Sequence, residues 1–287
     1  MQIDNKNTLC AVLVNYNDSR YLINWVEKMA LQMPDELIIV DDCSTDPSVE
    51  LIYHLQKKYP QIKLILRHKN GGCFEAFMTG VNNTECTHVS CWSCDDDPLP
   101  GYISRMKQAI NDYPFVSIFT SNALIKREEY LYERVMMPFD SYISPQHLFK
   151  VAKIKGLAGI NVIGNVTKRE HVIDCWNRCY LKTHFDAWYI FTAAFTTGVV
   201  ILAENLVLYR ANFRGLGSSR TLGDNVKSIK KMNHALVYFP EAQKYLSQLK
   251  MWTVRQTIIS TCILWLLPHL PKFIRKWMYK KVYSMTL

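Results

Sequence analysis

The sequence contains neither a low-complexity segment nor an apolar run long enough to cross a membrane. The nearly uncharged stretch at residues 256–267 is stopped by Pro268, and a transmembrane helix needs about 20 residues. Residues 1–7 lack the apolar core of a signal peptide. These absences argue against a membrane-spanning, secreted or disordered protein and favour a globular chain in a reducing cytosol.

The chain also lacks the paired cysteine motifs of a zinc-binding module. Its nine cysteines, an odd number, are scattered. Cys91 and Cys94 form one C-x-x-C, and Cys175 and Cys179 lie four apart, but no second C-x-x-C of matching spacing occurs. Because a buried cysteine usually packs as a small hydrophobe, core packing is favoured over a structural metal site.

Acidic residues are outnumbered by basic ones. The chain carries 34 Lys and Arg against 25 Asp and Glu, a formal charge of +9, and 49% of its 287 residues are apolar. The apolar share is enough for a large core. The positive charge favours anionic partners such as nucleic acid, acidic lipid or phosphorylated substrates, without choosing among them.

Strands and helices alternate through the first 120 residues. Continuous apolar runs indicate strands buried on both faces of a parallel sheet, and the segments between them have apolar residues at helical spacing. This alternation predicts a parallel, right-handed α/β unit. The predicted strands are residues 8–16, 36–40 and 62–66, the run before Asp95, and residues 115–120; the predicted helices are residues 20–32, the segment between Asp46 and Pro60, residues 73–82, and a segment after Gly101.

The second half of the sequence is less regular. Residues 121–160 mix charges, aromatics and prolines without a clean period, which is typical of an insertion over a site. Helices are predicted within residues 167–196, a closing strand at residues 198–209, and helices again from residue 222. We therefore predict an α/β domain over residues 1–221 and a helical extension over residues 222–287.

Three consecutive carboxylates, Asp95, Asp96 and Asp97, follow the fourth predicted strand, and strand ends are where open α/β sheets bind ligands. The three charges repel one another unless a cation lies among them, and in an extended segment Asp95 and Asp97 point to the same side. Their oxygens suit Mn²⁺ or Mg²⁺. A solvated acidic turn is the alternative, but a second acidic strand end, Asp41-Asp42, favours the metal site.

A set of short motifs occurs in a fixed order along the chain. They are Asn15-Tyr16-Asn17, Val40-Asp41-Asp42-Cys43-Ser44-Thr45-Asp46, Asn70-x-Gly72, Asp95-Asp96-Asp97 and Tyr209-Arg210. Their order and spacing resemble glycosyltransferase family 2, inverting enzymes that use nucleotide-sugar donors. Its members have the GT-A fold, a Rossmann-like, mostly parallel sheet flanked by helices. The resemblance covers residues 8–112 and, less fully, residues 184–214; it is absent from residues 121–160 and from the tail.

The resemblance implies a role for each motif. Asp41 or Asp42 would meet the base or ribose, Asp95 would lie near the ribose and diphosphate, and Asp97, with Asp95, would ligate Mn²⁺ or Mg²⁺. Such a cation neutralises a diphosphate leaving group. Arg210 would contact the diphosphate, with a loop-anchoring salt bridge as the alternative. The implied donor-binding set is Asn15, Asn17, Asp41, Asp42, Asn70, Gly72, Asp95, Asp96 and Arg210.

An inverting transfer needs a base that accepts the proton of the acceptor hydroxyl. The resemblance implies a carboxylate at the start of a late helix, and Asp186, in His184-Phe185-Asp186-Ala187-Trp188, occupies that position. The alternative is a carboxylate that only stabilises the helix dipole, by about 0.3–1 kcal/mol. His184 is the second candidate base. The chain departs from the family at Asn212, where relatives often have a histidine.

Residues 269–287 contain basic and aromatic side chains and no acid. That composition suits the surface of an anionic membrane, so we expect peripheral attachment at the cytosolic face. A helix that packs on the domain or forms a homodimer is the alternative. Nucleic acid is disfavoured, because the basic residues gather at this end and not around aromatic platforms in the α/β core.

These features predict a metal-dependent inverting glycosyltransferase. It would move a sugar from a UDP- or dTDP-sugar to a hydroxyl of a glycan or lipid-linked acceptor, as in the synthesis of cell-surface polysaccharide or lipopolysaccharide. The alternatives are a nucleotidyltransferase acting on sugar phosphates and a non-catalytic nucleotide-binding scaffold on the membrane. A nucleotidyltransferase would prefer a Gly-rich phosphate loop, which residues 8–20 lack.

Deletion of residues 269–287 tests the membrane prediction. We expect the shortened chain to be released from anionic vesicles, because the basic and aromatic side chains that would hold it there are gone. Hydrolysis of the nucleotide-sugar donor should persist. Vesicle co-sedimentation and a hydrolysis assay measure the two properties, and unchanged vesicle binding would contradict the prediction.

Overall fold

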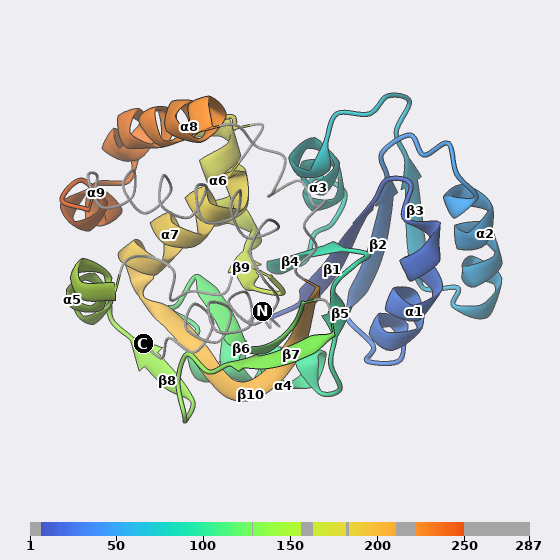
Figure 1. The fold of residues 1–287 in the computed structure, drawn as a ribbon, viewed down its shortest axis with the longest axis horizontal. Coiled ribbons are helices and arrows are strands. Elements are labelled where there is room, and N and C mark those ends of the chain that lie inside the picture. Colours follow the sequence, from blue (N-terminus) through green and yellow to red (C-terminus); the bar gives the residue numbers. More distant parts are fainter. Residues whose placement is uncertain (1–6, 128, 156–162, 182–183, 211–221, 250–287) are drawn as a thin grey trace, which may run out of the picture.

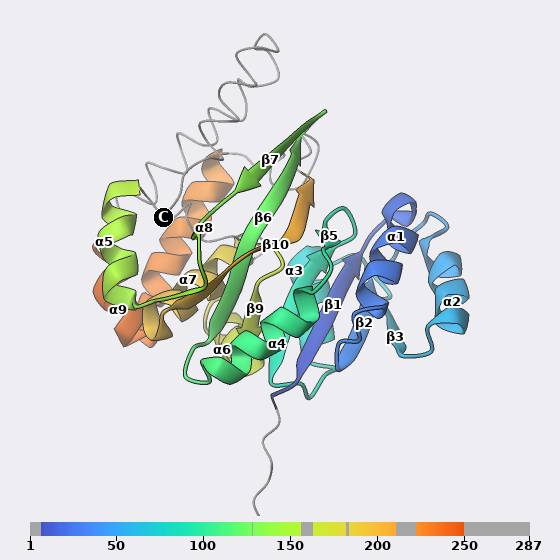
Figure 2. The same cartoon turned by 90° about the horizontal axis from the view of Figure 1, so that it is seen from below.

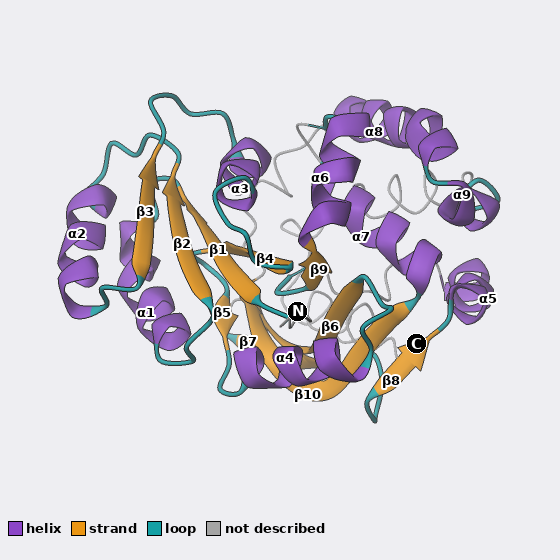
Figure 3. Ribbon diagram, turned by 180° about the vertical axis from the view of Figure 1, so that it is seen from behind, coloured by secondary structure: helices purple, strands orange, loops and turns teal. Residues whose placement is uncertain are grey.

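The computed structural model describes residues 7–127, 129–155, 163–181, 184–210 and 222–249. In these ranges a mixed sheet is flanked by helices on both faces (Figure 1, Figure 3). The strand order is β3-β2-β1-β4-β9-β6-β10-β5, with β7 paired to β6 and β8 to β10. The predicted α/β class is confirmed.

The first half of the chain builds the parallel part of the sheet. β2 and β4 pair with opposite edges of β1, and β3 pairs with β2, all in parallel. All elements but the short β5 follow their predicted ranges closely. They are β1 (Leu9–Asn15), α1 (Ser19–Ala30), β2 (Glu36–Asp41), α2 (Ser48–Lys58), β3 (Ile62–Leu66), α3 (Cys73–Val81), β4 (His88–Ser93), β5 (Asp97–Pro98) and α4 (Tyr102–Asp112).

The second half completes the sheet with strands of both directions. β6 and β10 pair in parallel, β9 lies antiparallel between β4 and β6, and β5 and β8 pair antiparallel with β10. The elements are β6 (Ile118–Arg127), β7 (Tyr130–Arg134), β8 (Ser141–Ile143), α5 (Pro145–Lys155), β9 (Val166–Lys168), α6 (Arg169–Arg178), α7 (Phe185–Thr197) and β10 (Val199–Arg210).

Residues 121–160, predicted to be irregular, contain regular structure. β6 continues to Arg127, β7 returns beside it as a projecting ribbon (Figure 2), and β8 and α5 follow. The prediction is wrong here because β7 has no fully buried residue. The apolar alternation that identifies a strand is therefore weak in this segment.

The described chain ends with α8 (Leu222–Ala235), the 3₁₀ helix η2 (Leu236–Tyr238) and α9 (Pro240–Leu246). The Tyr245 ring of α9 lies 5.8 Å from that of Phe195 on α7, so α9 shares a core with the α/β domain. The predicted boundary at residue 221 and the basic tail lie outside the described residues and stay predictions. In the described ranges, no helix combines the length and apolarity that crossing a bilayer requires.

Helices cover both faces of β1, whose residues point alternately to the two sides. Val12 belongs to the core beneath α3 and α7, whereas Ala11 and Leu13 belong to the core beneath α1 and α4. α3 lies close to the sheet because Gly80 has no side chain: a Cβ there would be 2.4 Å from Cγ1 of Val12. This close contact sets the position of α3, whose N-terminus borders the site described next.

Candidate active site

β1 and β2 end side by side, and side chains join their last residues. Asn15 is opposite Asp41 in the strand register, both are buried, and Asn15 Nδ2 donates to Asp41 Oδ1 at 2.7 Å. The Asp41 carboxylate also accepts the N–H and the hydroxyl of Ser44, at 2.9 and 2.6 Å. Asn15 and Asp41 therefore hold the turn after β2, and their contact with a nucleotide stays a prediction.

Asn17 fixes the same turn from the β1 side. Its φ is 55°, a left-handed conformation in which asparagine is enriched. Its Oδ1 accepts the N–H of Thr45 at 2.7 Å and of Asp46 at 3.2 Å. Asp46 in turn accepts the N–H groups of Ser19 and Ser48, at 3.1 and 3.0 Å. The loops after β1 and β2 therefore order each other and the starts of α1 and α2.

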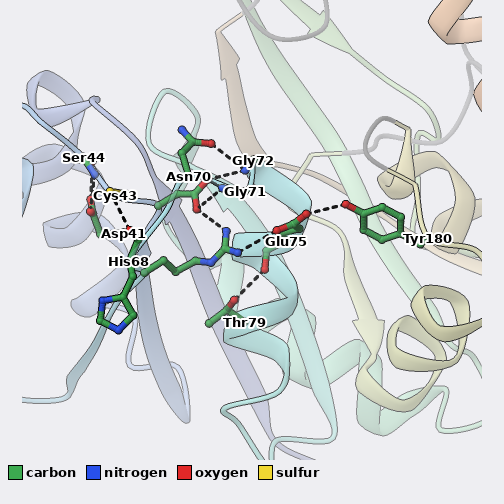
Figure 4. Close-up of polar contacts among 12 residues, drawn as sticks. Asp41, Cys43, Ser44, His68, Asn70, Gly71, Gly72, Glu75, Thr79 and Tyr180 are labelled. Atoms are coloured by element: carbon green, nitrogen blue, oxygen red, sulfur yellow. Dashed lines mark hydrogen bonds and ion pairs between the residues drawn. The ribbon is translucent and has the colours of Figure 1, made fainter.

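Asp42 reaches the start of α3. It is buried, forms an ion pair with Arg67, and accepts the N–H groups of Gly71 and Gly72, the latter at 2.7 Å. Asn70 Oδ1 accepts the same Gly72 N–H at 3.0 Å (Figure 4). The φ of Gly72 is 90°, which glycine adopts without strain. The Asp42 carboxylate thus lies at the helix N-terminus, where negative charge is favoured, and Asn70 and Gly72 shape the loop around it.

Arg67 and Glu75 belong to no motif and were not predicted as site residues. Arg67 Nη2 lies 3.1 Å from Glu75 Oε2, so this guanidinium lies between the carboxylates of Glu75 and Asp42. The one sequence signal was an acid in the first turn of α3. It could not reveal the partner, because Arg67 comes from the end of β3.

The three consecutive aspartates separate in the structure, and Asp97 turns inward. It is fully buried and accepts from Lys28 Nζ at 2.6 Å, Arg210 Nη2 at 2.6 Å and Asn24 Nδ2 at 2.9 Å. Burial alone would raise the pKa of Asp97, but the bonds from Arg210 and Lys28 outweigh it and hold the pKa below its usual range. Two cations therefore neutralise this carboxylate, and the role of Asp97 as a metal ligand stays a prediction.

Arg210 binds the acidic turn from the end of β10. Its N–H donates to Asp96 Oδ1 at 3.1 Å and its Nη1 to the backbone oxygen of Asp95 at 2.7 Å. Asp96 is buried, and burial together with the Asp95 charge raises the pKa of Asp96 well above its usual range. Arg210 therefore anchors this loop. Its contact with a diphosphate, and that of Asp96 with a donor, stay predictions.

Asp95 is the member of the triplet with an available carboxylate. It is half-buried, and within the described ranges its carboxylate makes no hydrogen bond. Burial, and then the Asp95 charge, raise the pKa of Asp18, so these two acids are in electrostatic reach of each other. Hard oxygen donors of this kind suit Mn²⁺ or Mg²⁺, so the carboxylate of Asp95 is available for such a contact.

The protein side chains would supply only part of a metal's ligands. Among the residues that the structure describes, no group of three or more His, Cys, Asp or Glu is arranged to hold a metal ion. Every cysteine in the same ranges is a free thiol, and the buried Cys94 donates to Asn15 Oδ1 at 3.3 Å. Cys94, Cys175 and Cys179 are buried, whereas Cys91 is partly exposed. Water and substrate phosphates would complete the coordination of a cation at Asp95.

Asp186 lies half-buried in the first turn of α7. Its neighbour Phe185 packs on Phe74 of α3, with ring centroids 5.8 Å apart. A hydrogen bond with Cys73, burial and the Asp186 charge raise the pKa of Cys91 on β4. The contact of Phe185 thus places the start of α7 against α3, and the charge of Asp186 acts on a residue of β4. This position suits both the predicted base and a helix-terminal carboxylate.

The family of the chain follows from its sequence. The model of glycosyl transferase family 2 matches residues 10–179, more than half of the chain. The chain therefore belongs to glycosyl transferase family 2 and is a glycosyltransferase, which decides against the nucleotidyltransferase alternative. No curated protein matches the sequence significantly.

Solved structures of S. aureus TarS share the fold. Residues 1–349 of TarS in complex with UDP-GlcNAc superpose with a TM-score of 0.68 at 13% identity, over 88% of this chain and 71% of that one. The complex with UDP gives 0.68 at 12% identity, over 96% and 78%. A longer TarS structure gives 0.61 at 13% identity, over 80% and 40%. At this identity the likeness concerns the fold, and it confirms the predicted GT-A class.

Replacing Asp97 tests whether its carboxylate anchors the site. We expect Asp97→Asn to lower the free energy of unfolding at pH 7 by about 3 kcal/mol, because Lys28 and Arg210 lose the counter-charge of a fully buried carboxylate. The pKa of Asp97 is lowered in the folded state, so its stabilisation is complete above the unfolded value of about 3.9 and is lost as the pH falls below that.

Urea unfolding at several pH values measures this difference. The exposed Asp112→Asn is the matched control, and we expect it to change stability by less than about 0.5 kcal/mol. An Asp97→Asn variant as stable as the wild type at pH 7 would show that Asp97 is not an anchor.

Proposed function

We propose that this glycosyltransferase moves a sugar, with inversion, from a UDP- or dTDP-sugar to a hydroxyl of a glycan or lipid-linked acceptor, in a reaction that needs Mn²⁺ or Mg²⁺. One observation carries the proposal. In a chain of family 2, the ends of β1, β2 and β4 bring Asp41, Asp42 and Asp95 to one sheet edge, beside the N-terminus of α3. The TarS complexes with UDP-GlcNAc and UDP support a uridine donor.

In this proposal each acid has a separate task. Asp41 and Asp42 border the base and ribose, and the contacts already made to them keep their oxygens fixed, which is the preorganisation that binding and catalysis require. A divalent cation at Asp95, with Asp18 nearby, would neutralise the diphosphate leaving group. Asp186 accepts the proton of the acceptor hydroxyl.

The acceptor and the location follow from the tail. A basic and aromatic segment at residues 269–287 would hold the enzyme at the cytosolic face of an anionic membrane. Lipid-linked acceptors for cell-surface polysaccharide or lipopolysaccharide would then be within reach of the site. In this proposal residues 222–287 form the extension that carries the tail, and a homodimer through the tail is the alternative.

A thermal-shift screen of nucleoside diphosphates tests the donor class. We expect UDP or dTDP with Mn²⁺ to raise the melting temperature, because a ligand at about 100 times its Kd stabilises the folded state by about 2.7 kcal/mol. In Asp95→Asn the increment due to Mn²⁺ should disappear, whereas Asp112→Asn should behave as the wild type. A screen in which no nucleoside diphosphate stabilises the protein would reject the proposal.

Asp186→Asn tests the base. We expect it to keep the thermal shift of the nucleotide and to lose about 100-fold or more of the rate of donor hydrolysis, measured as nucleoside diphosphate release. His184→Asn is the comparison, because asparagine tolerates the φ of 63° at that residue. If the His184 variant were inactive and the Asp186 variant fully active, the base would be His184.

A further inference from the structure

A chain of polar contacts crosses from the end of β2 to the segment that precedes α7. Arg67 pairs with Asp42 through Nη1 and with Glu75 through Nη2, at 3.1 Å in the second case. Tyr180, which follows α6, donates its hydroxyl to Glu75 Oε1 at 2.7 Å (Figure 4). The two oxygens of Glu75 thus face opposite sides of the site: one the nucleotide edge, the other the segment leading to Asp186.

The hydrogen bond between Tyr180 and Glu75 lies at the surface, where Tyr180 is 41% exposed. The hydrogen bond to the Glu75 carboxylate, with burial, raises the pKa of Tyr180 to about 12, so the phenol keeps its proton throughout the physiological range. One guanidinium between the carboxylates of Asp42 and Glu75 leaves the group with one net negative charge. A hydroxyl donor to a charged acceptor makes a stronger bond than one between neutral groups.

The same segment is joined to the helix of Asp186 by aromatic contacts. The Tyr180 ring packs edge-on against Trp176 at 4.8 Å, and Trp176 packs against Phe185 at 4.9 Å. Phe185 in turn contacts Phe74 of α3 at 5.8 Å and immediately precedes Asp186. A displacement of Tyr180 relative to α3 can therefore be transmitted to the first turn of α7 through the packed rings of Trp176 and Phe185.

We propose that Glu75 and Tyr180 are positioning residues that couple occupancy of the donor site to the placement of Asp186. A nucleotide lying over Asp42 removes water from the contact chain, and a lower dielectric strengthens each charged hydrogen bond in it. The Tyr180 contact with Glu75 then holds the start of α7 more firmly against α3. The enzyme would thus order its base when the donor is bound. This inference rests on the proposed function, since it takes Asp42 to border the nucleotide.

Hydrogen exchange of a peptide covering residues 184–192, with and without UDP and Mn²⁺, tests the coupling in the full chain. In the wild type we expect UDP to slow exchange about fivefold, the lower end of ordinary coupling effects. Tyr180→Phe removes one hydroxyl, and Glu75→Gln removes the charge. Both should bind UDP within about twofold of the wild type, yet lose the slowing. Tyr53→Phe makes the same chemical change at an exposed residue of α2 and should retain it.

Steady-state kinetics separate positioning from structural support. We expect Tyr180→Phe to lower kcat for donor hydrolysis about tenfold with KM within about twofold, and its melting temperature to match that of Tyr53→Phe. UDP binding that leaves residues 184–192 unchanged in the wild type, or a Tyr180→Phe variant with normal slowing, overturns the coupling alone. Failure of both UDP and dTDP to bind overturns the proposed function, and this inference with it.

Discussion

A carboxylate buried at the end of a strand has to be neutralised, and this requirement shapes the whole site. Asp42 meets Arg67, and Asp97 meets Lys28 and Arg210. Removing one partner of such a pair typically costs about 3–5 kcal/mol. Because each partner comes from a different element, neutralising the acids also ties α1, β3 and β10 to the strand ends. The ion pairs of these acids therefore also hold together the elements that surround the site.

This pairing divides the acids into two groups. Asp41, Asp42 and Asp97 have their oxygens engaged by the protein, and their loops are therefore held in one arrangement before any ligand arrives. Asp95 has no such partner within the described ranges, and its charge acts on Asp18. A cation or a diphosphate would bind at a site whose loops are already held in place and in which Asp95 is the carboxylate left to adjust. Less of the protein then has to reorganise on binding.

The parallel half of the sheet was predictable because its strands are uninterrupted apolar runs with helices at regular spacing. The strand-end acids were predictable for the same reason, since a charge directly after a buried strand lies at the sheet edge. Which of these acids would be paired with basic side chains was not predictable. Asp95 and Asp97 have the same chemistry and differ only in what β10 and α1 bring to them, and those contacts span 69 to 115 residues of sequence.

β7 and the contacts of Arg67, Glu75 and Tyr180 were missed for related reasons. β7 packs on one neighbour and buries no residue completely, so its pattern carries little of the signal by which strands are recognised. The three side chains meet from the ends of β3 and α6 and the start of α3. The spacing of residues along the sequence does not indicate this contact, because the three groups come within hydrogen-bonding distance only in the folded chain.

The insertion of β9 between β4 and β6 bears on how the protein folds. β1 to β4 pair among themselves, whereas the outer edge of β4 pairs with β9, where His88 lies opposite Lys168, 80 residues further along the chain. That edge can be covered only after β9 has been synthesised. Until then the outer edge of β4 is an open sheet edge that can pair with other chains. Since chains grow at about 5–20 residues per second, the pace of the ribosome through this stretch sets how long that edge stays available for mispairing.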